Sequence, residues 1–247
     1  MKEIRQSKNE LPPGIALAWD RVSVPRRGPR PGHTLDEIVR KAIGLADRDG
    51  ILALSLPKIA ASLGLTRNAL YRYVKSKDEM LRLIHDAAWG VPPKFRLSGK
   101  GWRKETRTWA LAVIHGYRRH PWLLDVPITG PPSTPNVLRW LEALLEIISC
   151  SGLNAKDCLQ FALLLDGYAH SVARLSRDIS AGGQTRKQWT AVNAFLLPLL
   201  RQRNYPILAS ILTPSQYASE GSTIDYAEFG LDRILDSLDQ LIASQKP

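Results

Sequence analysis

The stretch that decides the fold is Leu56–Met80, LPKIAASLGLTRNALYRYVKSKDEM. It reads as two short helices joined by a tight turn at Gly64, followed by the start of a third helix. Ser55 and Thr66 stand where the first two helices begin, and a hydroxyl at that position accepts a hydrogen bond from a backbone N–H that has no partner within the helix. Pro57 is tolerated in a first turn because that N–H has no partner there in any case. The pattern predicts a helix-turn-helix unit.

The second of these helices combines an apolar side with polar and basic side chains. Leu70 and Val74, four residues apart, form the side that faces the core, so the residues between them project elsewhere. Arginine can bind guanine through two hydrogen bonds and asparagine can bind adenine in the same way, whereas a lysine on a phosphate supplies charge alone. We therefore expect the helix to lie in a DNA major groove, with Arg67 reading guanine, Asn68 reading adenine and Lys77 contributing charge.

The positive charge of the chain is concentrated around this unit. The net charge is +11 over 247 residues, and between Arg21 and Lys77 twelve Lys/Arg residues accompany only four acidic ones. A local basic excess favours a nucleic acid as partner over a generally basic surface. Residues 26–32, RRGPRPG, contain prolines and glycines that prevent a helix. Their three arginines, Arg26, Arg27 and Arg30, form either an arm that reaches a minor groove or phosphates, or a solvated linker.

Helical signals continue on both sides of the unit. Thr34 with Glu37, and Ser76 with Glu79, have the spacing of a capping box, which predicts that a helix begins at each pair. Residues 1–25 form either a mobile extension or a segment that docks on the protein through Ile15, Leu17 and Trp19.

The remainder of the chain has the apolar spacing of long helices, without an alternating strand pattern of useful length. We expect an all-α protein with an N-terminal helix-turn-helix DNA-binding domain and a larger helical domain. The predicted parts are an extension at 1–25, the DNA-binding domain at 26–77 and the helical domain at 78–247. Further helices are expected at about 101–119, 136–151, 154–180, 185–201 and 226–243.

Several classes of protein are disfavoured. Cys150 and Cys158 are the only cysteines, and they have neither a CxxC spacing nor a flanking histidine, so we expect no metal site and no cofactor. No apolar run approaches the roughly 18 residues of a membrane span, and the first residues lack the apolar core of a signal peptide. We therefore expect a cytoplasmic protein without a membrane partner. None of the usual enzyme motifs is present, and a pure protein-interaction module would not need the local positive charge.

The order of these parts resembles the TetR family of bacterial repressors. The resemblance is strongest over residues 34–50, TLDEIVRKAIGLADRDG, and residues 54–81, LSLPKIAASLGLTRNALYRYVKSKDEML. Residues 117–124, YRRHPWLL, and residues 228–242, EFGLDRILDSLDQLI, are similar to the C-terminal class that contains the tetracycline repressor.

The resemblance implies roles for residues around the turn. Thr66 to Ala69 would form the N-terminal turn of the recognition helix, Tyr71 would lie deep in the groove, and Tyr73 and Lys77 would hold phosphates. Pro57 departs from relatives that place a base-reading arginine near the start of the preceding helix, so any contact there falls to Ser55 or Lys58. The predicted DNA-binding residues are Arg26, Arg27, Arg30, Ser55, Lys58, Thr66, Arg67, Asn68, Ala69, Tyr71, Arg72, Tyr73 and Lys77.

The resemblance also implies a homodimer and a small-molecule effector. The helices at 154–180 and 226–243 would form the dimer bundle. The alternative is an ordinary intramolecular core, against which the apolar coverage around the long helix argues. The effector, apolar or aromatic, would bind in the larger domain and release a palindromic operator. Each aromatic candidate could instead be ordinary core, and Asp166 with His170 could instead be a pair on the helix surface. The candidate lining residues are Trp109, Val113, Tyr117, Trp122, Leu141, Phe161, Asp166, His170 and Trp189. The alternative is a regulator with the same DNA-binding unit that acts without a ligand or as an activator.

Overall fold

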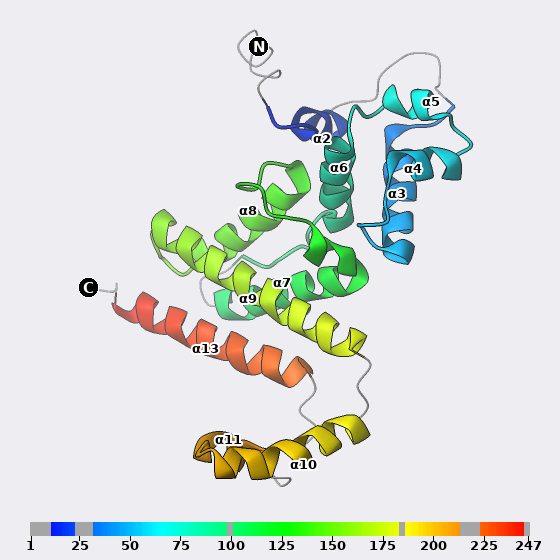
Figure 1. Cartoon of the computed structure of the whole chain (residues 1–247). Helices are drawn as coiled ribbons and strands as arrows, with labels where there is room; N and C mark the ends of the chain where they lie inside the picture. Colours follow the sequence, from blue (N-terminus) through cyan, green and yellow to red (C-terminus); the bar gives the residue numbers. More distant parts are fainter. Residues whose placement is uncertain (1–10, 23–31, 98–100, 183–185, 213–222, 245–247) are drawn as a thin grey trace. The chain divides into compact units, whose positions relative to one another are not determined.

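The computed structural model describes residues 11–22, 32–97, 101–182, 186–212 and 223–244, and every regular element in these ranges is helical (Figure 1). The all-α prediction is therefore confirmed. The chain divides into two compact units, Met1–Ala162 and Leu163–Pro247. The predicted functional boundary between residues 77 and 78 is a different division and stays a prediction.

Three helices of the first unit form the helix-turn-helix region: α3 (Leu35–Asp49), α4 (Leu56–Ser62) and α5 (Arg67–Tyr71). Helix α3 begins with the predicted capping box. The Thr34 hydroxyl accepts a hydrogen bond from the Glu37 N–H at 3.2 Å, and the Glu37 carboxylate accepts one from the Thr34 N–H at 2.8 Å. These bonds satisfy two backbone donors that the helix itself leaves without partners.

The recognition helix α5 is shorter than predicted. It ends at Tyr71 because the next N–H groups, those of Arg72 and Tyr73, bond to carbonyls three residues back, which tightens the last turn. Val74 lies outside the helix, yet its side chain is fully buried, as is that of Leu70. The apolar pair therefore anchors the segment as expected, although only one of the two residues is helical.

Helix α6 (Lys77–Trp89) connects this region to the rest of the first unit, which contains α7 (Trp102–Arg119), the 3₁₀ helix η2 (Pro121–Asp125) and α8 (Pro135–Ser149). An apolar stripe of Met80, Leu83, Ile84 and Ala87 is predicted for α6: the first three are at most 1% exposed, whereas Ala87 is half-buried. Helix α6 packs against α3 on one side and against α8 on another. It therefore contacts both the DNA-binding helices and the helices that follow them.

The N-terminal segment contains a helix, α2 (Ile15–Val22), that packs on α6 and α8 (Figure 1). The indole N–H of Trp19 donates a hydrogen bond to the Ser133 carbonyl oxygen at 3.0 Å, and Ile15 and Leu17 are half-buried. Residues 11–22 therefore dock on the protein, as the second of the two interpretations predicts.

The second unit contains the C-terminal part of α9 (Ala155–Ala181), α10 (Arg186–Gln202), α11 (Pro206–Ile211) and α13 (Thr223–Ser244). Helices α9 and α13 meet closely: the Tyr168 hydroxyl donates to the Ala227 carbonyl oxygen at 2.8 Å. A Cβ at Gly230 would overlap that hydroxyl oxygen. Only glycine permits this contact at position 230. The short helix α11 was not predicted.

Apolar side chains remain exposed on several helices of the second unit. Leu164 is 52% exposed and Leu175 56% exposed on α9, and Phe229 is 67% exposed on α13. Leu164 and Leu175 are eleven residues apart, close to three helical turns, so they project from the same side of α9. Exposed apolar side chains on one side of a helix are a feature of surfaces that bind another protein.

Among the described residues, no helix is both long enough and apolar enough to span a bilayer.

Helix α6 contains a histidine that gives the fold a pH dependence. Burial, assisted by the charge of Arg82, lowers the pKa of His85 to about 4 from the ordinary value of 6.5. The unfolded chain takes up a proton near pH 6.5 and the folded chain does not, so stability is complete above pH 6.5 and falls as the pH drops toward 4. We expect the free energy of unfolding in urea to fall by about 1–2 kcal/mol between pH 7.5 and pH 5 through this group.

The matched control is His85→Gln, which cannot titrate. Its free energy of unfolding should vary less with pH than that of the wild type by the same amount. Equal pH dependence in the two proteins would show that His85 is not the responsible group.

Candidate nucleic-acid interface

Helix α5 presents a polar face because its apolar side is fixed in the core. Leu70 is fully buried beneath the helix, and the Thr66 hydroxyl caps it by accepting a hydrogen bond from the Ala69 N–H at 3.2 Å. The side chains of Thr66, Arg67 and Asn68 are exposed. The first turn of the helix is therefore rigidly placed while its hydrogen-bonding groups face outward.

Arg67 and Tyr71 form a pair on this face. The guanidinium of Arg67 donates to the Tyr71 hydroxyl at 3.1 Å, and its carbon lies 5.4 Å from the centre of the tyrosine ring. A guanidinium held over a ring loses less rotational freedom when it binds a base. The pair therefore favours Arg67 as the residue that reads guanine, with Tyr71 orienting it.

The start of α4 contributes a lysine that is already engaged. The ammonium of Lys58 lies 2.8 Å from a carboxylate oxygen of Asp49. The two oxygens of that carboxylate each accept one hydrogen bond from the Arg48 guanidinium, both at 2.8 Å. These bonds hold the pKa of Asp49 well below its usual range, those from Arg48 being the larger cause. The Ser55 hydroxyl is the cap of α4, accepting from the Lys58 N–H at 3.4 Å. Lys58 must share or leave Asp49 before it can bind a phosphate.

Removing the Asp49 charge should therefore strengthen DNA binding. In Asp49→Asn, Lys58 and Arg48 lose their anionic partner, and each cation that then contacts a phosphate releases a counterion. We expect tighter binding, with a plot of log affinity against log salt steeper by about 0.9 for each new contact. Fluorescence anisotropy over a salt series measures this. Asp78→Asn is the control, since it removes an exposed carboxylate from the start of α6; equal effects of the two changes would contradict the ion-pair explanation.

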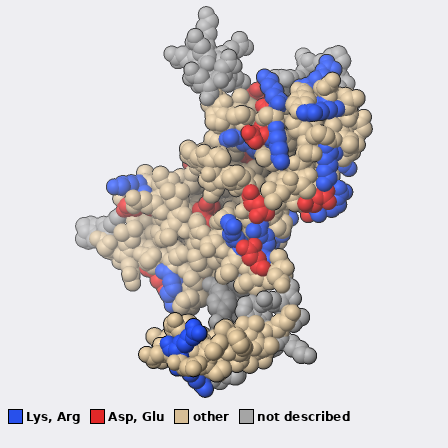
Figure 2. All heavy atoms as spheres, in the orientation of Figure 1, with Lys and Arg blue, Asp and Glu red and all other residues tan. Residues whose placement is uncertain are grey.

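The other predicted DNA contacts surround α5. Arg72 and Lys77 are exposed, whereas Ala69 and Tyr73 are half-buried. Figure 2 shows Lys and Arg side chains gathered over the surface of the helix-turn-helix region. Arg26, Arg27 and Arg30 lie outside the described residues.

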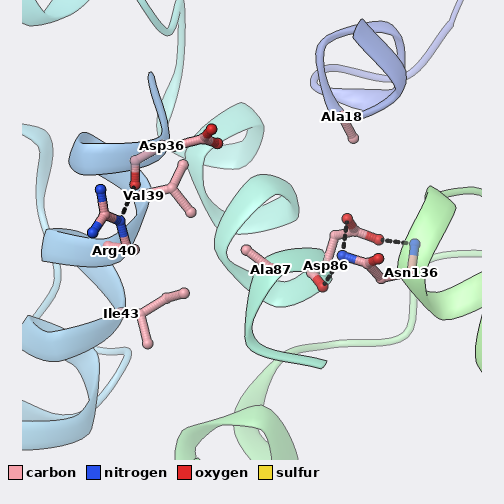
Figure 3. A pocket seen from close by; sticks show the side chains of 8 residues that line it. All are labelled: Ala18, Asp36, Val39, Arg40, Ile43, Asp86, Ala87 and Asn136. Carbon is pink, nitrogen blue, oxygen red and sulfur yellow. Dashed lines mark hydrogen bonds between the residues drawn. The ribbon is translucent and has the colours of Figure 1, made fainter. Parts of the chain in front are cut away.

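The link from α6 to α8 depends on a carboxylate that sequence reasoning missed. Asp86 is 2% exposed, and its carboxylate accepts a hydrogen bond from the backbone N–H of Asn136 at 2.8 Å (Figure 3). It accepts another from the backbone N–H of Val137 at 3.4 Å. It also accepts one from the Asn136 side-chain amide at 3.1 Å. The N-cap residue of α8, Thr134, makes no side-chain hydrogen bond to the helix. Asp86, which belongs to α6, therefore caps the N-terminus of α8 instead. The signal available in the sequence was a lone aspartate on the apolar side of α6.

Two tryptophans reinforce the same link. The indole N–H of Trp140, on α8, donates to the Gly90 carbonyl oxygen at 3.1 Å, at the end of α6. The rings of Trp140 and Trp89 meet edge to face with centres 5.6 Å apart. The end of α6 is therefore held to α8 by polar and aromatic contacts together.

Comparison with known proteins identifies the family. Residues 38–84 match the bacterial regulatory proteins of the tetR family, and residues 96–242 match the tetracyclin repressor-like C-terminal domain. The transcriptional repressor DrrR1 of Streptomyces coeruleorubidus is 33% identical over 238 residues, covering 94% of this chain and 87% of that protein. The chain belongs to the TetR family.

Other TetR-family relatives agree with this assignment. A transcriptional regulator of Saccharopolyspora erythraea is 30% identical over 208 residues, covering 83% of this chain and 84% of that protein. The fold is similar to that of ActR from Streptomyces coelicolor without ligand, with a TM-score of 0.74, 20% identity and coverage of 88% of this chain and 100% of that one. A structure of ActR with actinorhodin gives a TM-score of 0.68 at 23% identity, covering 85% and 96%. The chain is therefore a DNA-binding transcriptional regulator and not an enzyme.

The predicted effector residues of this TetR-family regulator fall in both units. In the first unit, Trp109, Val113, Tyr117 and Phe161 are buried and Leu141 is half-buried. Asp166 is exposed and His170 half-buried on α9 in the second unit, and the side chain of Trp189 lies outside the described ones. The pKa of Asp166 is raised by desolvation, which the charge of His170 opposes.

The buried aromatic residues of the first unit have distinct partners. Trp109 donates its indole N–H to the Trp140 carbonyl oxygen at 2.9 Å, and Tyr117 meets Trp89 edge to face at 4.9 Å. Trp122 instead donates to the Asp47 carboxylate at 2.7 Å, at the C-terminal end of α3. Trp109 and Tyr117 thus belong to the aromatic cluster at the end of α6, whereas Trp122 joins η2 to α3.

A groove lies elsewhere in the first unit, with a volume of about 510 Å³ (Figure 3). It is lined by residues of α2, α3, α6 and α8. The Asp86 carboxylate in this groove already accepts a hydrogen bond from the Asn136 side-chain amide. The lining residues are Ala18, Asp36, Val39, Arg40, Ile43, Asp86, Ala87 and Asn136.

Proposed function

We propose that this regulator is a repressor that binds a palindromic operator as a homodimer and is released by an apolar or aromatic effector. The observation that carries the proposal is the position of α6, which packs on α3 of the DNA-binding region and is bonded through Asp86 to α8. A shift of α8 on effector binding would therefore be passed to the DNA-binding helices.

The DNA-binding part of the proposal rests on α5. One recognition helix buries too little surface for tight, specific binding. Two such helices, related by the dimer axis, can enter successive major grooves about 34–36 Å apart. We assign base contacts to Arg67 and Asn68, orientation of Arg67 to Tyr71, and phosphate contacts to Tyr73 and Lys77, with Thr66, Ala69, Arg72, Ser55 and Lys58 beside them.

The dimer part rests on the second unit. The exposed apolar side chains of α9 and α13, Leu164, Leu175 and Phe229, would be covered by the same face of a second copy. The pairing of α9 with α13 inside one chain, through Tyr168 and Ala227, makes a two-helix surface that is suited to a four-helix interface.

The effector part rests on the aromatic residues and on the relatives. We propose that the effector binds within the first unit, among Trp109, Val113, Tyr117, Leu141 and Phe161. The candidates of the second unit, Asp166, His170 and Trp189, stay predictions. Trp122 is a weaker candidate because its indole N–H is bonded to Asp47. The fold neighbour ActR has been solved with actinorhodin, which makes a compound of that kind a reasonable first probe. As a regulator of bacterial DNA the protein would act in the cytoplasm.

Release from DNA requires a coupling free energy between the two sites. Moving the population from 1:99 to 99:1 in favour of the released state needs about 5.5 kcal/mol of differential effector affinity. A buried aromatic site can supply a large part of this through ring contacts and excluded water.

The test is a titration of the protein–operator complex with actinorhodin. Fluorescence anisotropy of labelled DNA from upstream of the protein's own gene reports release, and tryptophan fluorescence reports binding. We expect quenching and release over the same concentration range, and weaker quenching in Trp109→Phe with an unchanged affinity for DNA. A complex that stays intact while the probe saturates the protein would contradict release by this class of compound and favour the ligand-independent alternative.

A further inference from the structure

Helix α2 begins directly on the backbone of α6. Gly14, just before α2, has a φ of +87°, and a Cβ there would lie 3.0 Å from the Glu79 carbonyl oxygen and 3.3 Å from the Arg82 Cβ. A side chain at this position would be both strained and crowded. The start of α2 is therefore seated on α6 at a distance that only glycine allows.

The rest of α2 reaches α8. Ala18 is 1% exposed, and its side chain lines the same groove as Asp86 of α6 and Asn136 of α8 (Figure 3). One residue further on, the Trp19 indole N–H bonds to the Ser133 carbonyl oxygen, two residues before α8 begins. Helix α2 thus spans the junction at which Asp86 joins α6 to α8.

The contacts of α2 also indicate that it affects α6 and does not itself bind DNA. The groove of about 510 Å³ lies among α2, α3, α6 and α8, with Val39 and Ile43 of α3 in its lining. Space is therefore available beside α3, while α2 is in close contact with α6 and α8.

We propose that α2 is a clamp that holds α6 on α8 and thereby sets the affinity of the regulator for its operator. A clamped α6 keeps the DNA-binding helices in a narrow range of orientations, so less conformational freedom is lost when two copies of α5 enter DNA. Loosening the clamp weakens operator binding. It removes no phosphate contact, so the salt dependence of binding stays the same.

The experiment uses the full chain with uncharged substitutions that disrupt the packing of α2 on α6 and α8. Gly14→Val places a branched side chain against the α6 backbone, and Ala18→Leu places a larger one in a buried position. Trp19→Ala, which removes the bond to Ser133 from an exposed site, covers the case in which the first two variants fold poorly. Leu11→Ser is the matched control, since Leu11 is exposed and precedes α2.

Two measurements are compared: amide hydrogen exchange along α6, and anisotropy with the operator fragment over a salt series. We expect at least fivefold faster exchange in α6 and at least fivefold weaker operator binding in each of the three variants, with the wild-type salt slope, and no change in Leu11→Ser. Unchanged or tighter operator binding would overturn the proposal. A changed salt slope would also overturn it, because it would place α2 or its neighbours on the DNA.

Discussion

Arginine substitutions on the exposed apolar face of α9 are expected to abolish specific operator binding. In the double variant Leu164→Arg with Leu175→Arg, two side chains that are 52% and 56% exposed in the single chain acquire charges that a dimer interface would have to bury without partners. The dimer should dissociate, and operator affinity should fall toward the non-specific level, a loss of about 1,000-fold or more. Sedimentation and anisotropy measure the two effects.

The matched control retains the apolar face. Leu164→Met with Leu175→Met should remain dimeric and bind the operator as the wild type does, because volume-conserving apolar changes are well tolerated. A double arginine variant that is still dimeric, or a monomer that binds the operator at wild-type affinity, would contradict the assignment of this face.

Among the single substitutions proposed, loss of the Asp86 carboxylate is expected to lower the free energy of unfolding most. In Asp86→Ala the N–H groups of Asn136 and Val137 lose a buried, charged acceptor. The free energy of unfolding in urea should fall by about 2–4 kcal/mol. Asp86→Asn keeps one acceptor oxygen and should cost about half as much.

Asn136→Ala separates the backbone cap from the side-chain contact. It removes the two 3.1 Å bonds that the side-chain amide donates to the Asp86 carbonyl and carboxylate oxygens, and it leaves the backbone N–H bonds to Asp86 in place. We expect a loss of about 1 kcal/mol. A fall of less than 1 kcal/mol in Asp86→Ala would show that the α8 terminus does not depend on this carboxylate.

The local elements of the DNA-binding region could be predicted from sequence because their signals are local. The cap residues Thr34, Ser55 and Thr66 each act within four residues, and the structure shows a hydrogen bond to every one of them. The length of α5 could not be predicted, because Val74 is buried by tertiary packing after the helix has ended.

Contacts between distant segments could not be predicted from the sequence. The bonds from Asn136 to Asp86 and from Trp122 to Asp47 join residues 50 and 75 positions apart. Nothing in the neighbourhood of either residue indicates its partner. The same reason left two interpretations open for the N-terminal segment, since Trp19 bonds to a residue 114 positions away. Lys58, a predicted DNA contact, forms an ion pair with Asp49 only nine positions away, and spacing alone does not predict that pair either.

The central claim, that α5 reads base pairs in an operator, is tested most directly by operator affinity in Arg67→Ala and Lys77→Ala. Each variant is titrated against the operator and against versions with one symmetric base pair changed. For Arg67→Ala we predict that discrimination at one base-pair position falls by about 1–3 kcal/mol. For Lys77→Ala we predict equal weakening on every sequence and a salt slope lower by about 1. Altered base preference in Lys77→Ala together with unchanged preference in Arg67→Ala would contradict the account.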